Sequence, residues 1–415
     1  MTDPRNILIK SKRLIDGTGS PPIEDAAILV GNGAILEVGH AQGLTAPPGT
    51  ETIDLGERTI MPGIVDAHMH LYGVPRTYPF VFPPTLPLSD RGILAARDAR
   101  EMLEAGITAC RCLGSEVGPS VRRAIRDGVT TGPRMVASGE FIGTTGGTWD
   151  HVNLPLDWIR TTELTTDGPD GFRQTVRQRI REGANVIKIG LSKGRPDDRN
   201  FGWGDDPYTN IPAVSSSELD ALVDEAHAHD FKVAAHAIGD AAVRMALDHG
   251  VDTIEHGYAI TDETRKRLVD ENALVVTTLC QMHFHLQGAE KKPDWLVKVF
   301  KRHHDAQTES FQKSLEAGVR FALGTDLVGA PSHPLDQAAK EFELVTSLGM
   351  DPMDAIVAGT KIASEALGME DSIGTLELGK QADIIAFTGD PISDITCLQR
   401  VEFVMQGGKV IVDNH

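Results

Sequence analysis

The sequence predicts an α/β protein: a (β/α)8 barrel with a small β-sandwich domain built from both ends of the chain. Between residues 61 and 374, short apolar runs alternate with stretches of helical periodicity, and a glycine commonly separates the two. About eight such units in roughly 300 residues are typical of a closed barrel. No glycine-rich phosphate loop is present, which argues against an open nucleotide-binding sheet.

The helix-to-strand units of the barrel follow one pattern. Residues 90–105 are amphipathic, stop at Gly106 and precede the strand-like run 107–112. Further helices of this kind are expected at 169–182, 219–229, 241–249 and 311–317. Each precedes another apolar run, as parallel strands with helical crossovers require.

The two ends of the chain have the pattern of β-hairpins. Runs 28–30 and 34–38 flank Asn32-Gly33, a strong signal for a tight turn. Similar strand-like runs near the other end are 382–387, 401–405 and 409–412. Neither end has enough strands for a stable sheet alone. We therefore expect residues 1–60 and 375–415 to form one small domain beside the barrel of 61–374.

The composition excludes several classes of protein. The formal net charge is −19, which argues against a nucleic-acid partner. No secretory signal pattern and no run of about 18 apolar residues occur, so we expect a cytoplasmic protein without a membrane partner. The four cysteines lack CxxC spacing and fit reduced core thiols.

The most informative motif is His68-Met69-His70 at the end of the apolar run Ile64-Val65. In a strand, residues spaced i, i+2 lie on the same face, so one cation can bind both imidazoles. Four further candidate ligands, each at the end of its own strand-like run, are Lys188, His236, His256 and Asp326. Barrel enzymes carry their chemistry at the carboxyl ends of the strands. Imidazoles with a carboxylate favour a divalent ion such as zinc over magnesium or calcium.

Lys188 is the exceptional member of this set. A protonated amine has no lone pair and repels a cation. Lys188 is therefore either a structural or substrate-binding charge elsewhere, or it carries a carbamate formed with CO₂ and becomes a carboxylate-like ligand.

Four motifs carry a resemblance that covers essentially the whole chain. They are Met61-Pro62-Gly63, Ile254-Glu255-His256-Gly257, Leu323-Gly324-Thr325-Asp326 and the segment 374–383. With these motifs the sequence resembles the binuclear metal-dependent hydrolases of the amidohydrolase superfamily. It is most similar to the imidazolonepropionase-like group, which includes prolidase-like dipeptidases.

The resemblance implies a role for each candidate ligand. Two divalent metal ions are expected, with zinc favoured. His68, His70 and Asp326 would bind the more buried ion, His236 and His256 the more exposed one, and a carbamate on Lys188 would bridge them. A metal-bridging hydroxide would attack the substrate carbonyl, and Asp326 would pass its proton to the leaving amine. The resemblance also implies a homo-oligomer.

Substrate contacts are expected from three residues. In similar dipeptidases a histidine closely follows Thr-Gly-Gly and helps to hold substrate. Here residues 148–150 intervene before His151, so a substrate contact and a plain loop histidine both remain open. Tyr258 and Tyr208 follow the runs of His256 and Lys188, and each could contact a substrate carboxylate or carbonyl.

Other histidines and one loop leave alternatives open. His283 and His285, at the end of the strand-like run 274–279, could contact substrate, bind an extra metal ion or form a rim pair. His303-His304 is expected on a solvated helix face. The proline-rich segment 78–87 could serve as a lid or an oligomer contact.

These residues favour an enzyme that hydrolyses C–N bonds of a small molecule. The first interpretation is cleavage of an amide or peptide bond in a carboxylate-bearing substrate, a dipeptide or an N-acyl amino acid, in the manner of a dipeptidase or carboxypeptidase. The alternative is another C–N or ester bond, as in a carbamate, a urea or an amide-linked toxin or xenobiotic. The resemblance disfavours deamination, because deaminases of the superfamily usually lack the equivalent of Lys188 and carry a glutamate three residues after the equivalent of His236, where Gly239 stands here. A barrel without catalysis would be expected to lack one or more of the six ligands.

Overall fold

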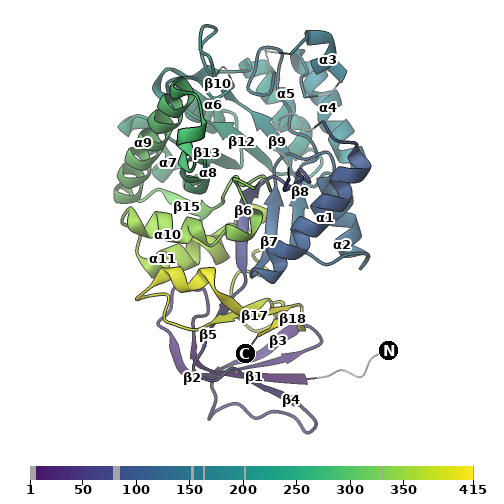
Figure 1. Ribbon diagram of the computed structural model, residues 1–415, viewed down its shortest axis with the longest axis vertical. Coiled ribbons are helices and arrows are strands. Elements are labelled where there is room, and N and C mark those ends of the chain that lie inside the picture. Colours follow the sequence, from purple (N-terminus) through teal and green to yellow (C-terminus); the bar gives the residue numbers. More distant parts are fainter. Residues whose placement is uncertain are drawn as a thin grey trace.

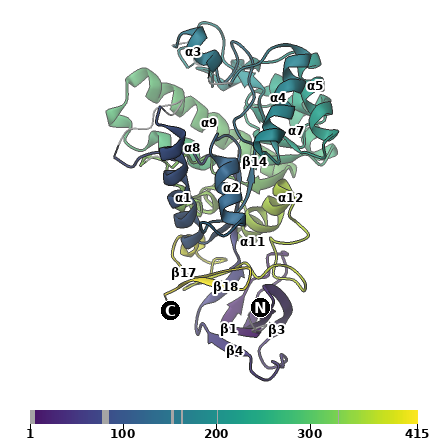
Figure 2. The same ribbon diagram turned by 90° about the vertical axis from the view of Figure 1, so that its right-hand side faces the viewer.

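The computed structural model describes residues 6–77, 85–150, 154–161, 164–200, 202–329 and 331–414. A large α/β region carries a smaller β-rich domain at one end (Figure 1). The view at right angles shows the same division (Figure 2). In this part of the chain, no helix combines the length and apolar character needed to span a membrane. Most of the segment 78–87, considered above as a lid or an oligomer contact, lies outside the described residues.

The large region is the predicted (β/α)8 barrel. Its parallel strands are β6 (Ile64–Met69), β7 (Ile107–Cys112), β8 (Arg134–Ala137), β9 (Ile187–Gly190), β12 (Val233–Ala237), β13 (Thr253–His256), β14 (Leu274–Thr277) and β15 (Arg320–Leu323). Strands β6 to β8 form one ladder and β9 to β15 a second. Backbone hydrogen bonds join the ladders at both seams: Ile142 N–H donates to Lys188 O (2.8 Å), and Asp326 N–H donates to His68 O (2.7 Å).

Helices cover the outside of the strands. They are α1 (Leu88–Glu104), α2 (Gly118–Arg126), α4 (Gly168–Glu182), α5 (Ser216–His227), α6 (Asp240–Asp248), α7 (Asp262–Asp270), α9 (Asp294–Ala317), α10 (Lys340–Ser347), α11 (Pro352–Val357) and α12 (Ala363–Leu367). Short elements α3 (Leu156–Thr161), β10 (Ser192–Lys193), β11 (Ile211–Pro212) and α8 (Leu279–Leu286) lie in the loops that follow strands. The sequence pattern located α1, α4, α5 and α6 to within a few residues.

Helix α9 is much longer than the predicted 311–317. Its first turns contain many charged residues, which hid the apolar spacing of Val299, Phe300 and Ala306. These side chains are buried, so the tertiary contacts of one face extend the helix upstream.

The β-rich domain combines both ends of the chain, as the hairpin patterns indicated. Its strands are β1 (Asn6–Leu14), β2 (Ile23–Gly31), β3 (Ala34–His40), β4 (Glu51–Asp54), β5 (Thr59–Pro62), β16 (Ile384–Phe387), β17 (Val401–Gln406) and β18 (Lys409–Asp413). The hydrogen-bonded order is β18-β17-β16-β5-β1-β2-β3, with β4 beside β1. Ile28, Ile60 and Phe403 belong to one buried cluster, so the two ends of the chain share a core.

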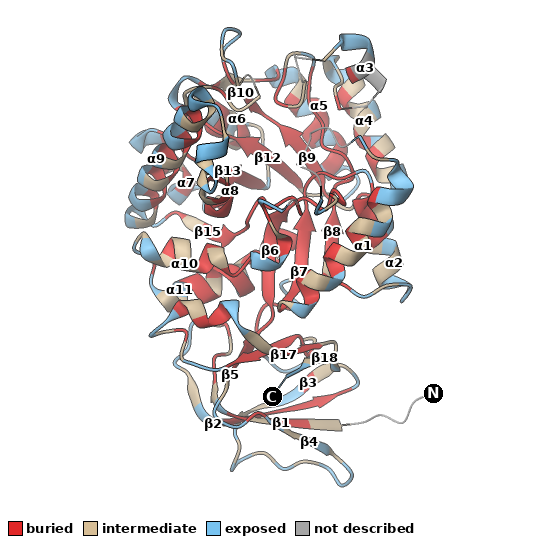
Figure 3. Cartoon of the chain, in the orientation of Figure 1, coloured by how far each residue is buried: buried red, intermediate tan, exposed pale blue. Residues whose placement is uncertain are grey.

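Gly63 connects the two regions, because β5 ends at Pro62 and β6 starts at Ile64. Its N–H donates to Asp383 O at 3.0 Å, which fixes the start of the barrel to the β-rich domain. Figure 3 shows that the strands on both sides of this connection are buried.

We predict that Gly63→Ala lowers the free energy of unfolding by about 1–3 kcal/mol, because the added β-carbon would overlap the Thr108 side chain. Gly92→Ala in α1 is the matched control, since a β-carbon there meets no atom within 4 Å and a helix favours alanine. Urea unfolding monitored by circular dichroism measures both. Equal stability of Gly63→Ala and the wild type would contradict this packing argument.

Candidate active site

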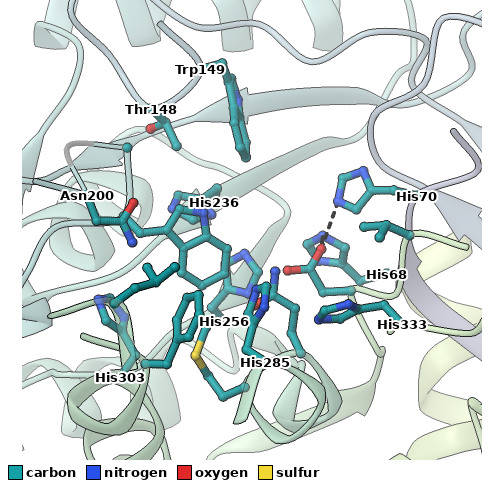
Figure 4. A pocket seen from close by; sticks show the side chains of 18 of the residues that line it. His68, His70, Thr148, Trp149, Asn200, His236, His256, His285, His303 and His333 are labelled. Atoms are coloured by element: carbon teal, nitrogen blue, oxygen red, sulfur yellow. Dashed lines mark ion pairs between the residues drawn. The ribbon is translucent and has the colours of Figure 1, made fainter. Parts of the chain in front are cut away.

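The six predicted ligands lie together at one end of the barrel strands. His68 lies in β6, and His70 directly follows that strand. Lys188 lies in β9, His236 in β12 and His256 at the end of β13. Asp326 follows β15 by three residues. All six are buried and line one cavity of about 390 Å³. Figure 4 shows the labelled histidines gathered around this hollow, with Thr148 and Trp149 on the side opposite to His285 and His333.

His68, His70 and Asp326 form the tightest group. Asp326 Oδ1 lies 2.9 Å from His70 Nε2 and 3.5 Å from His68 Nε2. One ligand atom from each residue lies within 4.8 Å of the others, a spacing that can hold a metal ion.

The backbone at two of these positions is unusual. His256 has φ 72° and Asp326 has φ 56°, the left-handed region that non-glycine residues rarely adopt. A non-glycine residue in this conformation raises the free energy of the folded state by on the order of 1 kcal/mol or more, so contacts with its surroundings must hold it in place. At Asp326 the neighbour Thr325 is fixed, since its hydroxyl donates to Asp66 Oδ2 at 2.7 Å. Such positions cluster at functional sites.

His236, His256 and Lys188 surround the rest of the cavity floor. The rings of His236 and His256 lie 4.6 Å apart. Within the described residues, both ring nitrogens of His236 and the Nζ of Lys188 are buried without a hydrogen-bond partner. Buried polar atoms are normally paired, so these nitrogens fit a site that binds a cation or an ordered polar group.

Burial keeps three of the imidazoles uncharged and makes Lys188 easier to deprotonate. It lowers the pKa of His68, His236 and His256 well below the usual range, which leaves their imidazoles neutral with a lone pair for a metal ion. Burial also lowers the pKa of Lys188 to about 8, with Glu255 and Asp326 opposing the shift. A neutral amine is the form that reacts with CO₂, so this environment suits a carbamate.

A second layer of side chains orients the imidazoles. Glu255 Oε2 lies 2.7 Å from His68 Nδ1, and Thr278 Oγ1 lies 2.8 Å from His256 Nδ1. His70 Nδ1 lies 3.0 Å from Gly114 O, to which it must donate. With the Nδ1 of His68, His70 and His256 engaged, their Nε2 atoms are left to bind a metal, as in other metal sites.

Glu255 is itself held by a fully buried ion pair. Arg111 Nη2–H donates to Glu255 Oε1 at 2.8 Å, and the Thr253 hydroxyl donates to the same oxygen at 2.6 Å. In the sequence, Glu255 stands out only as part of the motif Ile254-Glu255-His256-Gly257, and its position directly before a candidate ligand was the available signal.

The two candidate tyrosines do not line the cavity. The Tyr258 hydroxyl lies 2.6 Å from His303 Nδ1, and His303 Nε2 lies 2.9 Å from Gly204 O. Tyr258 therefore contacts a residue of the cavity lining, His303, without lining the cavity itself. Tyr208 is 57% exposed and its hydroxyl donates to Glu309. His151 lies outside the described residues.

The solvated helix face expected at 303–304 is wrong for His303. His303 is buried on the inner face of α9, whereas His304 is half exposed. The basic residues around it conceal the apolar face of this helix, so its inward direction was not visible in the sequence.

His283 and His285 lie on helix α8. The prediction that they stand at the end of the strand-like run 274–279 is wrong, because the strand β14 stops at Thr277 and a helix follows. The Glu341 carboxylate accepts the N–H groups of Leu279 and Cys280 at 2.8 and 2.7 Å, which stabilises the start of this helix. Because residues two apart diverge on a helix, only His285 lines the cavity. Its ring stacks on Phe300 at 4.3 Å and meets His333 at 4.5 Å.

Several lining residues were missed by the sequence analysis. They are Arg199, Asn200, Trp203, Gln281, Met282, Leu296, Phe300 and His333, together with Thr148, Trp149 and Asp150 from the loop that contains His151. These residues lie mainly in loops and at helix ends, where no periodic pattern indicates direction.

A barrel with this cluster at its strand ends defines a class of hydrolases, and comparison with known proteins gives the family. The Amidohydrolase family model matches residues 59–411, so the chain belongs to the amidohydrolase family, whose enzymes act on C–N bonds. The predicted superfamily and fold are thereby confirmed.

Three relatives illustrate the similarity. Ochratoxinase of Aspergillus niger is 30% identical, over 97% of this chain and 86% of its own sequence. Its crystal structure superimposes with a TM-score of 0.87, 27% identity and coverage of 99% and 96% of the two chains. A crystal structure of a Xaa-Pro dipeptidase with bound methionine in the active site gives 0.86 at 29% identity, with 98% and 99% covered. Imidazolonepropionase of Fusobacterium nucleatum is 23% identical over 90% of this chain and 86% of its own.

We predict that Glu255→Gln lowers the free energy of unfolding of the metal-free protein by about 3 kcal/mol or more, because it leaves the buried Arg111 without its counter-charge. Asp270→Asn is the matched control, since it removes an exposed i, i+4 pair with Lys266 and should change stability by less than about 0.5 kcal/mol. Urea unfolding in the presence of a chelator measures both variants. Equal effects of the two substitutions would contradict a structural role for the buried pair.

Proposed function

We propose that this protein hydrolyses an amide or peptide bond in a small carboxylate-bearing substrate, a dipeptide or an N-acyl amino acid. The observation that carries the proposal is the convergence of four imidazoles, a lysine and an aspartate at one cavity, with the nitrogens of His236 and Lys188 unpaired among the described residues. A barrel retained only for assembly would not need to bury these groups together without partners.

We propose that two divalent metal ions, with zinc favoured, bind this cluster. His68, His70 and Asp326 would hold one ion, and His236 and His256 the other. A carbamate on Lys188 would contact both ions and replace a costly buried cation by an anionic ligand. The neutral imidazoles and the lowered pKa of Lys188 support this set of donors.

When bound, such ions acidify water and polarise a carbonyl group. The residues of this chain supply the other requirements. Asp326 has one carboxylate oxygen beside His70 and His68, from where it can take a proton from the attacking water and deliver it to the leaving nitrogen. Aromatic side chains line the cavity, and a substrate bound against them would displace water and so strengthen electrostatic interactions within the site.

The relatives support cleavage of a C–N bond and keep a second candidate open. Similarity to a Xaa-Pro dipeptidase favours a peptide or acylated amino acid. Similarity to ochratoxinase over nearly the whole chain favours the alternative substrate class, here an amide-linked toxin or xenobiotic. The same alternative includes carbamates, ureas and esters.

We also propose that the chain divides into a β-rich domain (1–60 and 375–415) and a catalytic barrel (61–374). We further propose that the protein is a homo-oligomer that acts on small molecules in the cytoplasm. The shared core of the chain ends supports the division. The four free, buried cysteines support a reducing compartment.

We predict that Asp326→Asn retains bound metal but loses turnover by about 10²–10⁴-fold, because an amide can serve as a ligand but cannot shuttle the proton. Protein purified with zinc and bicarbonate is assayed against N-acyl amino acids, dipeptides, carbamates and ureas, with metal content measured in parallel. Asp305→Asn, at an exposed position of α9, is the control and should match the wild type.

The outcomes separate the candidate functions. Turnover of amides confined to the wild type and the control supports the proposal. Turnover of carbamates or ureas alone supports the alternative bond class. Asp326→Asn retaining more than a tenth of wild-type activity would remove Asp326 from proton transfer.

A further inference from the structure

We propose that Glu341, which lies outside the cavity, is a positioning residue for the part of the cavity wall formed by α8. Its carboxylate, carried by α10, caps the start of α8 in place of the N-cap residue Thr278, and this leaves the Thr278 hydroxyl to orient His256. The role rests on the proposed function only in its kinetic test, since the contacts themselves are present in the structure.

Helix α8 supplies three side chains to the cavity. Gln281, Met282 and His285 line it. The amide oxygen of Gln281 is buried and has no hydrogen-bond partner among the described residues, so it is placed to accept a hydrogen bond from a bound molecule. The position of α8 therefore decides where a polar acceptor and two larger side chains meet the substrate.

The start of α8 has an unusual cap. The first N–H groups of a helix have no partner within the helix, and a serine or threonine at the N-cap commonly accepts one of them. Thr278 occupies the N-cap of α8, but its hydroxyl makes no capping hydrogen bond. Its Oγ1 lies 2.8 Å from His256 Nδ1 instead. Thr278 is thus engaged by a candidate metal ligand, and another group must satisfy the start of the helix.

Glu341 is that group. Its Oε1 accepts the Leu279 N–H at 2.8 Å, and its Oε2 accepts the Cys280 N–H at 2.7 Å. Glu341 also lies in the first turn of α10, so the carboxylate is close to the positive ends of two helix dipoles. Phe284 of α8 and Phe342 of α10 belong to one buried cluster, which holds the two helices against each other.

The contact needs both oxygens of an ionised carboxylate. Burial raises the pKa of Glu341 to about 7, and the N–H groups of Leu279 and Cys280 oppose this shift. A glutamine at this position would have the same size, but its amide nitrogen cannot accept the second N–H. Glu341→Gln therefore separates the capping contact from the packing of the side chain.

Hydrogen exchange measured by mass spectrometry above this pKa tests the cap in the full chain prepared with zinc and bicarbonate. In Glu341→Gln we expect the amides of 279–286 to exchange at least about tenfold faster, because a charge-assisted contact is lost at the helix start. The amides of β12 should keep their protection. Glu343→Gln is the matched control, since it removes a carboxylate from the same helix whose hydrogen bonds come from Lys340 and Gln399.

Two results of this experiment would overturn the proposal. The first is equal exchange of 279–286 in Glu341→Gln and the wild type. The second is an equal loss of protection in β12, because Glu341 would then support the whole fold and not α8 in particular.

Thr278→Val tests which residue caps α8. We expect exchange of 279–286 to stay within about twofold of the wild type, whereas the loss of a working N-cap would speed it about fivefold. Faster exchange comparable with that of Glu341→Gln would return the capping role to Thr278 and overturn the assignment to Glu341.

Kinetics test the effect on the wall. For the amide of the substrate panel that the wild type hydrolyses with the highest kcat/KM, we expect Glu341→Gln to raise KM about tenfold and to change kcat less than about threefold. Glu343→Gln should match the wild type. A fall in kcat at unchanged KM, or an equal rise in KM in the control, would overturn the role in positioning the wall.

Failure of this proposal is distinguishable from failure of the proposed function. If protein with two metals per chain hydrolyses no member of the panel, the proposed function fails, and hydrogen exchange alone decides the role of Glu341. If amides are hydrolysed and Glu341→Gln changes neither exchange nor KM, only the role of Glu341 fails.

Discussion

The site depends on one buried ion pair at the centre of the barrel. Arg111 on β7 donates to Glu255 on β13, and it also donates to Ala67 O on β6 and to Ala366 O on α12, at 2.6 and 3.2 Å. Glu255 in turn faces the imidazole of His68. A buried pair is costly to desolvate, but with every hydrogen bond satisfied it fixes three strands and one ring nitrogen in a single arrangement. With Nδ1 of His68 held by Glu255, its Nε2 faces Asp326 at 3.5 Å.

The barrel and the loops divide the work of the site between them. The strand ends supply His68, Lys188, His236 and His256 on a rigid frame, which holds donor atoms at fixed separations. The loops after the strands and the helices α8 and α9 supply the wall of the cavity. Enzymes of one family can therefore keep one chemistry and change substrate by altering the wall, as expected for a fold shared at similar TM-scores by an ochratoxinase and a Xaa-Pro dipeptidase.

Local patterns predicted the frame because its signals are local. The i, i+2 spacing of His68 and His70 and the glycine before most of the strands specify position without knowledge of the rest of the fold. The wall could not be predicted in this way. His303 is turned inward by the packing of α9, and α8 begins where the distant Glu341 caps two N–H groups. Tyr258 follows His256 closely but has its hydroxyl engaged by His303, a partner 45 residues away.

Six side chains of this cavity are proposed to bind two metal ions, with a modified lysine between them. The most direct test of this proposal is a crystal structure of the protein prepared with zinc and bicarbonate, with anomalous diffraction recorded at the zinc absorption edge. We expect two anomalous peaks per chain, one among His68, His70 and Asp326 and one beside His236 and His256, with carbamate density on Lys188 between them. A single peak or none, with an unmodified Lys188, would contradict it.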